Sequence, residues 1–474
     1  MTTNSSIPSW QGAGTVPPFT GALHTDARAL ERYIAECHRL LSTLPARTER
    51  NSAEQSTAEH ALRSARSARR AFLAHHTERV YALLTDDLSR ARRLTDLVRA
   101  ASDRFPGLLP TREQLEAERQ YIQAHRDGHE IDQGVFCGAV LRSPTAGTHL
   151  MESMLLPTER AQSLAETFTR TGRIALDRVL LERRGHAAHV TFLDADCLNA
   201  EDDRLIVDLE TAIDLALLDE QVRVGVLRGG PVAHPRYQGK RVFSAGINLK
   251  DLRNGAISFV DFLLTRELGY IHKLTRGLLL PSIPYRYRAA DPNATISLVG
   301  GARSGAWCER LVSKPWIGAV DSFAIGGGMQ LLLTLDRVIA ESGAFFSLPA
   351  AAEGIVPGVG NLRLTRLTGA RLARQVILSG RRIHTNDPEA RLLCDEIVPG
   401  EAMDETIERA TSHLGTPAVA ANRHMLALGE EPLDHFREYL AEFAVVQSAR
   451  AYSGDVLAKV EQRWQHSQRS GAGR

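Results

Sequence analysis

Two glycine-rich turns could present backbone N–H groups to a negatively charged oxygen. In residues 242–250 an apolar run ends at Ala245-Gly246, and in residues 319–331 three glycines, 326–328, precede a helical segment. Glycine permits a sharp turn and lets a ligand approach the backbone, which would direct the N–H of Ile247 into a site. Free N–H groups at the start of a helix favour developing negative charge. The two turns therefore predict a site where such a charge is stabilised.

A third stretch, residues 346–360, is punctuated by Gly and Pro but is too apolar for a surface turn. We interpret it as the wall of a pocket. Each of the three stretches is a weak signal alone, because glycine-rich strand–helix turns are common in α/β proteins. Their combination and order carry the prediction.

The sequence lacks the better-known catalytic motifs. Residues 358–360 lack the third glycine of a dinucleotide fingerprint, and Ser304 does not lie in a nucleophile elbow. His75-His76, His186 and His189 have no neighbours at metal-ligand spacing, so structural roles are expected for them. We therefore predict neither a metal site nor a nucleotide cofactor.

Strands that alternate with helices must position the three stretches. We expect strands at 174–183, 188–193, 222–227, 316–320 and 337–341, and helices at 202–218 and after Gly326. This alternation predicts an α/β core with crossover connections. Residues 270–312 form a long insertion, of the kind that shapes a site or an interface.

Helical patterns flank this core on both sides. We predict a flexible arm at 1–24, a mainly helical N-terminal domain at 25–172, the α/β core at 173–400 and a C-terminal helical region at 401–474. Thr111 and Thr158 begin helical stretches that reach 126 and 171, and helices are expected at 434–445 and 456–464. One continuous apolar helical face is expected at Val80, Leu84, Leu88, Ala91, Leu94 and Val98. The many arginines of this domain are either solvated and paired with nearby acids or a surface for an anionic ligand.

Composition narrows the possible functions. The 474 residues include 57 Lys+Arg and 56 Asp+Glu, a net charge of +1, which argues against nucleic-acid binding. The apolar fraction of 43% suits a soluble globular protein. Five scattered cysteines indicate reduced thiols, and neither a signal peptide nor an apolar run of membrane-spanning length is present. A cytoplasmic protein with no membrane partner is expected.

The combination of 243–246, 326–328 and the Pro357-Gly358 loop resembles the crotonase (enoyl-CoA hydratase/isomerase) superfamily. The resemblance covers about residues 174–400 and implies a spiral core of ββα units. It implies an oxyanion hole, formed by the N–H groups of Ile247 and Gly327, for the carbonyl of an acyl-CoA thioester. It also implies a homo-oligomer built from trimers, possibly a hexamer.

Two positions depart from the hydratases of that family. Where they carry a glutamate after the glycines this chain has Gln330, and where they carry a second one after the proline it has Ala350. Glutamine cannot take up a proton at neutral pH, and alanine can neither donate nor accept one. Hydration of an enoyl-CoA is therefore not expected.

With the helical N-terminal domain and the insertion, this pattern looks like one subgroup, the acyl-CoA dioxygenases of glycopeptide-antibiotic biosynthesis. This closer resemblance covers nearly the whole chain, most strongly from residues 198–201 through Arg266 and Gln330 to Gly358. It implies that (3,5-dihydroxyphenyl)acetyl-CoA and O2 become 3,5-dihydroxyphenylglyoxylate and CoA. It further implies that neither a metal nor an organic cofactor takes part, and that the substrate carbanion supplies the electron to oxygen.

The same resemblance implies roles for individual residues. Glu201 would bind one ring hydroxyl, Arg266 would contact the other or hold the ring, and Gln330 would hydrogen-bond the ring side. The alternatives are a helix N-terminal acid for Glu201, a surface arginine for Arg266 and an ordinary helix amide for Gln330. A dry oxygen pocket would be lined by Ala350, Ile355 and Gly358. The thioester and CoA would be bound by His234, Tyr237, Ala245, Gly246, Asn248 and Lys250.

Two other functions remain open at this point. The chain could run another crotonase reaction, such as thioester hydrolysis, or be a non-catalytic CoA-binding protein that has lost its acids. Glu201 and Arg266 discriminate, because a scaffold does not need polar groups that face a ring. The sequence does not fix the ring substitution, the oligomer number or the group that removes the α-proton.

Overall fold

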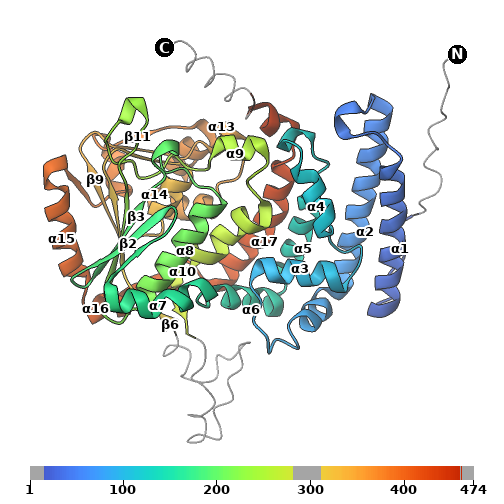
Figure 1. The fold of residues 1–474 in the computed structure, drawn as a ribbon, viewed down its shortest axis with the longest axis horizontal. Helices are drawn as coiled ribbons and strands as arrows, with labels where there is room; N and C mark the ends of the chain where they lie inside the picture. Colours follow the sequence, from blue (N-terminus) through green and yellow to red (C-terminus); the bar gives the residue numbers. More distant parts are fainter. Residues whose placement is uncertain (1–14, 281–310, 460, 462–474) are drawn as a thin grey trace, which may run out of the picture.

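A computed structural model describes residues 15–280, 311–459 and 461 of the chain. An α/β part containing the sheets lies at one end, and the helices within residues 23–142 lie at the other (Figure 1). The long helix α17 (Leu433–Arg450), close to the C-terminus, runs between these two parts. Each part has its own large apolar core.

The main sheet has seven strands in the order β1-β2-β3-β4-β7-β9-β12. The strands β3, β4, β7, β9 and β12 are parallel, and β1 and β2 form an antiparallel meander with β3. The strands span Arg173–Ala175 (β1), Val179–Arg184 (β2), Ala187–Phe192 (β3), Val224–Gly229 (β4), Trp316–Val320 (β7), Arg337–Glu341 (β9) and Glu396–Val398 (β12).

Two smaller sheets accompany it. One has the order β11-β10-β8 and the other pairs β5 with β6. Their strands span Leu278–Leu279 (β5), Leu311–Val312 (β6), Phe323–Ile325 (β8), Phe345–Ser347 (β10) and Ile383–His384 (β11). The first of these sheets carries the second and third glycine-rich stretches at its strand ends, which brings the two stretches together.

Helices cover both faces of the main sheet. The amphipathic helix α8 packs its apolar side on one face, and α15 packs on the other. The helices of the α/β part and the C-terminal region span Asp203–Leu218 (α8), Leu249–Asn254 (α9), His272–Arg276 (α10), Gly327–Leu332 (α12), Ala350–Glu353 (α13), Gly360–Ser379 (α14), Met403–Leu414 (α15) and Pro417–Glu430 (α16). Short 3-10 turns lie at Ala195–Cys197 (η3), Pro235–Tyr237 (η4), Pro388–Leu392 (η8) and Gly400–Ala402 (η9).

The chain is helical from residue 23 to residue 171, and the core of this helical part also takes in α17. The helices span Leu23–Ser42 (α1), Ser52–Leu84 (α2), Leu94–Arg104 (α3), Arg112–Arg119 (α4), Glu130–Arg142 (α5), Pro144–Leu155 (α6) and Glu159–Thr171 (α7), with 3-10 turns at Arg47–Glu49 (η1) and Gln123–His125 (η2). Leu440 and Ala444 of α17 belong to the same buried cluster as Phe136 of α5. The C-terminal helix is therefore part of the N-terminal core.

One predicted helix is broken in the structure. The apolar face expected from Val80 to Val98 ends at Leu84, because Asp86, Asp87 and Leu88 all have φ between 48° and 67°. The Asp87 N–H donates to the carbonyl of Ala82 at 2.8 Å, which closes the helix end. Aspartate tolerates this left-handed conformation better than most residues, so the break falls at the acidic pair.

Other predicted elements match the structure with small shifts. The strands predicted at 316–320 and 337–341 coincide with β7 and β9. Thr111 and Thr158 cap their helices through their side chains, although α4 ends at Arg119 rather than at 126. The strand predicted at 174–183 is two strands, β1 and β2. Most of the predicted insertion at 270–312, and Cys308, lie outside the described residues.

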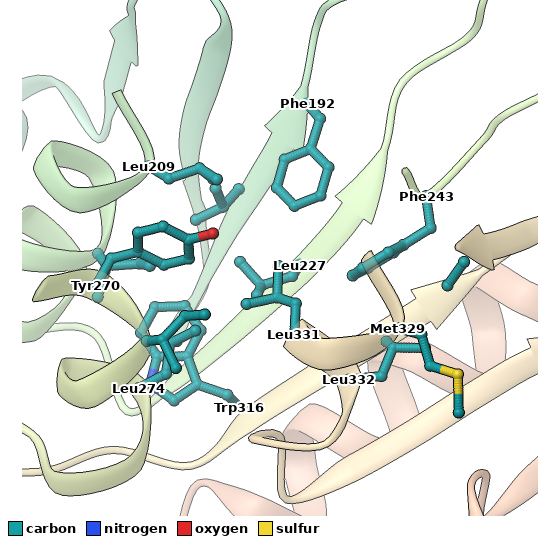
Figure 2. Close-up of a cluster of buried hydrophobic side chains, with 14 of the residues drawn as sticks. Phe192, Leu209, Leu227, Phe243, Tyr270, Leu274, Trp316, Met329, Leu331 and Leu332 are labelled. Carbon is teal, nitrogen blue, oxygen red and sulfur yellow. The ribbon is translucent and has the colours of Figure 1, made fainter. Parts of the chain in front are cut away.

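The polypeptide between α9 and α10 has an unusual helical geometry. Phe259–Leu264 (η5) and Glu267–Ile271 (η6) are π-helical, and Gly269 within η6 has non-helical dihedral angles. Tyr270 of η6 lies in the main core together with Leu209 and Leu274 (Figure 2). Irregular helices of this kind occur often at functional sites. The segment between the two π-helices carries Arg266.

Candidate active site

A cavity of about 380 Å³ lies where all three glycine-rich stretches meet. The turn before α9, the glycines before α12 and the loop after β10 each supply part of its wall, and the π-helical segment closes one side. Phe443 of α17 also lines it. The residues that could bind an oxyanion and those that could bind a ring therefore share one space.

The first two stretches approach each other at backbone distance. Ser244 pairs with Ala324 in a β-bridge, and the N–H of Ile325 donates to the carbonyl of Ser244 at 2.9 Å. A Cβ atom on Gly246, whose φ is 88°, would lie 3.2 Å from the nitrogen of Gly327. The two N–H groups predicted to form an oxyanion hole thus lie beside the same small volume.

Neither of these two N–H groups is used by the rest of the described chain. The neighbouring N–H groups are bonded, that of Gly326 to the Ser347 carbonyl at 2.8 Å and that of Asn248 to the Glu201 carbonyl at 2.9 Å. No acceptor within residues 15–280 or 311–461 takes the N–H of Ile247 or of Gly327. Both groups are therefore available to a bound carbonyl oxygen.

Three consecutive glycines are needed because the space beside them is filled. Gly326 has φ 55° and ψ −116°, a conformation that disfavours any side chain. A Cβ atom on Gly327 would collide with the carboxylate of Glu201, and one on Gly328 would lie 2.7 Å from the Cβ of Ser244. The glycines let the start of α12 pack directly against Glu201 and the first stretch.

Glu201 and Arg266 form a buried ion pair at the cavity. They are 2% and 4% exposed, so neither is a surface residue. The Arg266 Nε donates to Oε2 of Glu201, and its Nη2 donates to Oε1 at 3.0 Å. Although burial opposes the charge, the carboxylate of Glu201 holds the pKa of Arg266 well above its usual range.

All five N–H donors of the Arg266 guanidinium have partners in the structure. Besides the two bonds to Glu201, they reach Glu267 Oε1 at 2.8 Å, Gln330 Oε1 at 3.1 Å and the Gly327 carbonyl at 2.9 Å. A bond from Arg266 to a substrate hydroxyl would require it to give up one of these. Its geometry is that of a residue that orients Glu201 and Gln330.

This arrangement fixes the orientation of the Gln330 amide. A guanidinium only donates, so the amide oxygen of Gln330 must face Arg266 and its NH2 group faces away. Glu201 keeps acceptor capacity on Oε1, which has a single bond from Arg266. The cavity wall formed by Glu201 and Gln330 therefore offers one acceptor, Oε1 of Glu201, and one donor, the NH2 group of Gln330.

The sequence prediction missed two side chains in this network. Tyr270 donates its hydroxyl to Oε2 of Glu201 at 3.2 Å, and burial raises its pKa well above the usual value. Glu267 lines the cavity, binds Arg266 and accepts the N–H of Val359 at 3.3 Å. Glu267 directly follows Arg266 in the sequence, but nothing in the local pattern indicates that both are buried.

The residues predicted for an oxygen pocket, Ala350, Ile355 and Gly358, all line the main cavity. A Cβ atom on Gly358 would collide with Oε1 of Glu267, so this loop packs directly against the Arg266 network. Ile355 and Ile247 also line a second cavity of about 20 Å³, whose lining includes the apolar Leu263 and Val456 and the polar Gln447. Ala350 and Ile355 thus give the main cavity an apolar wall, and Glu201, Arg266 and Gln330 give it a polar one.

The residues predicted to bind CoA divide into two groups. Ala245, Gly246 and Asn248 line the cavity. His234 and Lys250 are exposed, and Tyr237 packs on Phe323 with 5.1 Å between ring centroids. None of these last three lines the cavity, so a CoA role for them stays a prediction.

Metal ligands and membrane spans were searched over the described part of the chain. No group of three or more His, Cys, Asp or Glu residues there is arranged to hold a metal ion. No helix of that part is long and apolar enough to cross a membrane. Of the four described cysteines, all free, Cys197 is exposed and lines the cavity, and the other three are buried.

Asp203, two residues after Glu201, gives the fold a pH dependence. Burial, followed by repulsion from Asp261, raises its pKa from 3.8 to about 7, and Ser258 donates to it at 3.3 Å. Between about pH 4 and pH 7 the folded chain holds a proton that the unfolded chain has lost, so stability falls as pH rises through this window.

Asp203→Asn should therefore raise the free energy of unfolding at pH 8 by on the order of 2 kcal/mol and change it little at pH 4. Thermal unfolding of the variant and the parent at both pH values measures this. The exposed Asp196→Asn is the matched control and should show no such difference. Equal effects of Asp203→Asn at both pH values would mean that folding does not raise the pKa of Asp203.

Comparisons with known proteins agree with this geometry. Residues 308–435 match the family model "Enoyl-CoA hydratase/isomerase". The chain is 51% identical over 435 residues to (3,5-dihydroxyphenyl)acetyl-CoA 1,2-dioxygenase of Amycolatopsis orientalis, covering 92% of this chain and 95% of that protein. It is 28% identical over 282 residues to mitochondrial enoyl-CoA hydratase of Pongo abelii, covering 58% of this chain and 79% of that protein.

The chain also aligns with solved structures. An enoyl-CoA hydratase/isomerase from Pseudoalteromonas atlantica T6c aligns over 61% of this chain and 98% of its own, with a TM-score of 0.46 and 17% identity.

Proposed function

Because the chain belongs to the enoyl-CoA hydratase/isomerase family, and within it to the family of (3,5-dihydroxyphenyl)acetyl-CoA 1,2-dioxygenase, we propose that it is an arylacetyl-CoA dioxygenase. The proposed substrate is (3,5-dihydroxyphenyl)acetyl-CoA, and the products are 3,5-dihydroxyphenylglyoxylate and CoA. One observation carries the proposal: a cavity with two open N–H groups also contains a buried Glu201–Arg266–Gln330 network. By the family resemblance, the reaction would serve glycopeptide-antibiotic biosynthesis.

The first chemical step is loss of an α-proton from the thioester. The thioester oxygen becomes an enolate oxygen, and the N–H groups of Ile247 and Gly327 stabilise its charge. Two such donors, fixed before the reaction, lower a barrier by several kcal/mol in comparable sites. Their backbone positions are held by the packing of Gly246 against residues 326 and 327, so they need no rearrangement when charge develops.

The two ring hydroxyls are bound by the polar wall. One hydroxyl donates to Oε1 of Glu201, and the other accepts from the NH2 group of Gln330. Arg266 binds the carboxylate and orients the amide, and it also donates to the carbonyl of Gly327 at 2.9 Å. Ring binding is thereby linked directly to the oxyanion hole.

Dioxygen reacts at the α-carbon from the apolar wall. The α-carbon loses both hydrogens and gains one oxygen atom as a ketone, while the acyl carbon exchanges its sulfur for the second oxygen atom. CoA leaves as the thiol, so substrate plus O2 equals arylglyoxylic acid plus CoA. Ala350 and Ile355 are suited to dioxygen, because their side chains offer no hydrogen-bond partner to a water molecule.

We propose that the reaction needs no metal or organic cofactor. The carboxylates of Glu201 and Glu267 are both bound to Arg266, which leaves them poor ligands for a cation. Activity should therefore survive exhaustive chelation by EDTA followed by gel filtration, at more than about half the untreated rate. Loss of activity that one added metal ion restores would contradict this prediction.

An oligomer and a cytoplasmic location complete the proposal. Helix α16 exposes Met425, Leu426 and Leu428, and the 65% exposed Met425 is unusual for a solvent-facing side chain. A contact between copies of the chain through α16 would fit the homo-oligomer that the family resemblance implies. CoA thioesters are cytoplasmic metabolites, which favours that location.

Incubation of the enzyme with (3,5-dihydroxyphenyl)acetyl-CoA under air and under nitrogen tests the function. Oxygen-dependent release of CoA is the expected result. Release that is equal under nitrogen would identify a thioesterase, and no release under either gas would favour a non-catalytic protein.

Enlarging Ala350 should impair oxygen use before it impairs substrate binding. Ala350 is 3% exposed, and Ala350→Leu would fill the space beside the α-carbon. Overpacking costs roughly 1–3 kcal/mol of stability, so the variant must first be shown folded by circular dichroism. We expect a higher KM for oxygen with near-normal affinity for a substrate analogue that cannot lose its α-proton. An equal loss of both would assign Ala350 to core packing alone.

A further inference from the structure

We propose that Tyr439 and Gln447 of α17 are positioning residues for the loop that carries Ile355 and Gly358. This loop forms the part of the cavity where dioxygen reacts in the proposed function, called here the oxygen side. This inference rests on the proposed dioxygenase function. It concerns a helix that lies outside the part of the chain that carries the glycine-rich stretches.

Three side chains of α17 bind the backbone of the loop that carries Ile355. Tyr439 donates its hydroxyl to the carbonyl of Gly358 at 2.7 Å, and Gln447 accepts the N–H of Val356 through Oε1 at 2.8 Å. Arg450 donates from Nε to the carbonyl of Gly354 at 2.8 Å. Gln447 lies about two turns beyond Tyr439, and Arg450 lies less than one turn beyond Gln447, so one rigid element holds the loop at three points.

The loop depends on such contacts because its conformation is unusual. Gly354 and Gly358 have φ of 83° and 43°, and the loop turns at both. A Cβ atom on Gly354 would lie 2.7 Å from the Val456 side chain, so the loop is pressed against the C-terminal residues. On its other side the loop is bound through the N–H of Val359, which donates to Glu267 at 3.3 Å.

The same side of α17 also reaches the two cavities directly. Phe443, one turn beyond Tyr439, lines the main cavity, and Gln447 lines the small cavity beside Ile247 and Ile355. Gln447 is 1% exposed, so its amide has no solvent to replace a lost partner. A change at either position alters the loop beside Ile355, on the oxygen side, while the bond between this loop and the Arg266 network is made by the backbone N–H of Val359, which donates to Glu267.

The hydroxyl of Tyr439 is a constant donor over the range in which the enzyme can be assayed. Burial raises its pKa well above the usual value for tyrosine, so it stays protonated. An effect of its removal should therefore be independent of pH, which separates it from any titration in the cavity.

Tyr439→Phe removes the hydroxyl and keeps the ring. We expect the apparent KM for oxygen to rise about 10-fold, the equivalent of one buried hydrogen bond. The KM for (3,5-dihydroxyphenyl)acetyl-CoA at saturating oxygen should stay within about twofold. Exchange of the α-protons with D2O under nitrogen, which needs no oxygen, should also be unchanged. Gln447→Met, which removes the amide acceptor at similar volume, should behave in the same way.

Tyr81→Phe is the matched control. It removes a buried hydroxyl, bonded to His149 at 2.7 Å, from the helical part of the molecule, and the KM for oxygen should not move. If Tyr439→Phe lowers exchange and oxygenation equally, or leaves the KM for oxygen unchanged, the positioning role is wrong. If the wild-type enzyme releases no CoA in an oxygen-dependent way, it is the proposed function that fails.

Discussion

Replacement of Arg266 by methionine is expected to lower kcat/KM for (3,5-dihydroxyphenyl)acetyl-CoA by about 10²–10³-fold. The guanidinium makes five hydrogen bonds, and without it the carboxylates of Glu201 and Glu267 would be buried without a cation. Glu201 would lose its orientation, the Gln330 amide would be free to turn, and the Gly327 carbonyl would lose a donor. Steady-state kinetics under air measures the effect.

A second variant separates catalysis from folding. Arg266→Met alone should reduce stability, because an unpaired buried charge costs about 3–5 kcal/mol. Glu201→Gln combined with Arg266→Met removes one of the two unpaired carboxylates, leaving that of Glu267, and should recover part of the lost stability. It should not recover activity, because the carboxylate acceptor for the ring is then missing. Recovery of activity in the double variant would mean that the pair serves only the fold.

Substitution of Gly327 by alanine is expected to lower kcat by about 10²–10³-fold, the usual consequence of losing an oxyanion-hole donor. The added Cβ atom would collide with the Glu201 carboxylate and lie 3.1 Å from Nη2 of Arg266. The start of α12 must then move, and the N–H of Gly327 moves with it. Exchange of substrate α-protons with D2O under nitrogen should fall in parallel, since enolate formation precedes any reaction with oxygen.

Gly429→Ala provides the control for this substitution. Gly429 lies in α16 with no atom near its Cβ direction and with an ordinary φ, so activity and exchange should be unchanged. If Gly327→Ala retains proton exchange at the wild-type rate, the N–H of Gly327 does not stabilise the enolate.

Local sequence patterns were sufficient to locate the backbone of the site. The glycines at 326–328 and at Gly246 could be recognised from the sequence because they lie where a side chain would collide with neighbouring atoms or force an unfavourable φ. The strands β7 and β9 were predicted to the residue, because a short β-branched run between turn residues has few other conformations.

The contacts made by distant residues could not be predicted in this way. Tyr439 and Gln447 lie about 80–90 positions beyond the loop they bind, and their helix shows no feature that indicates a role in the site. Tyr270 was missed because its partner Glu201 is 69 residues away. The break after Leu84 was missed because the helical spacing of apolar residues continues through Leu88. The positive φ values of Asp86 and Asp87 do not change that spacing, so it does not reveal the break.

Turnover of (3,5-dihydroxyphenyl)acetyl-CoA under ¹⁸O₂ is the most direct test of the central claim. Mass spectrometry of the arylglyoxylate should find one labelled oxygen in the ketone and one in the carboxylate, with one equivalent of free CoA for each product molecule. An unlabelled arylacetate with free CoA, or a carboxylate oxygen that comes from water, would contradict the account.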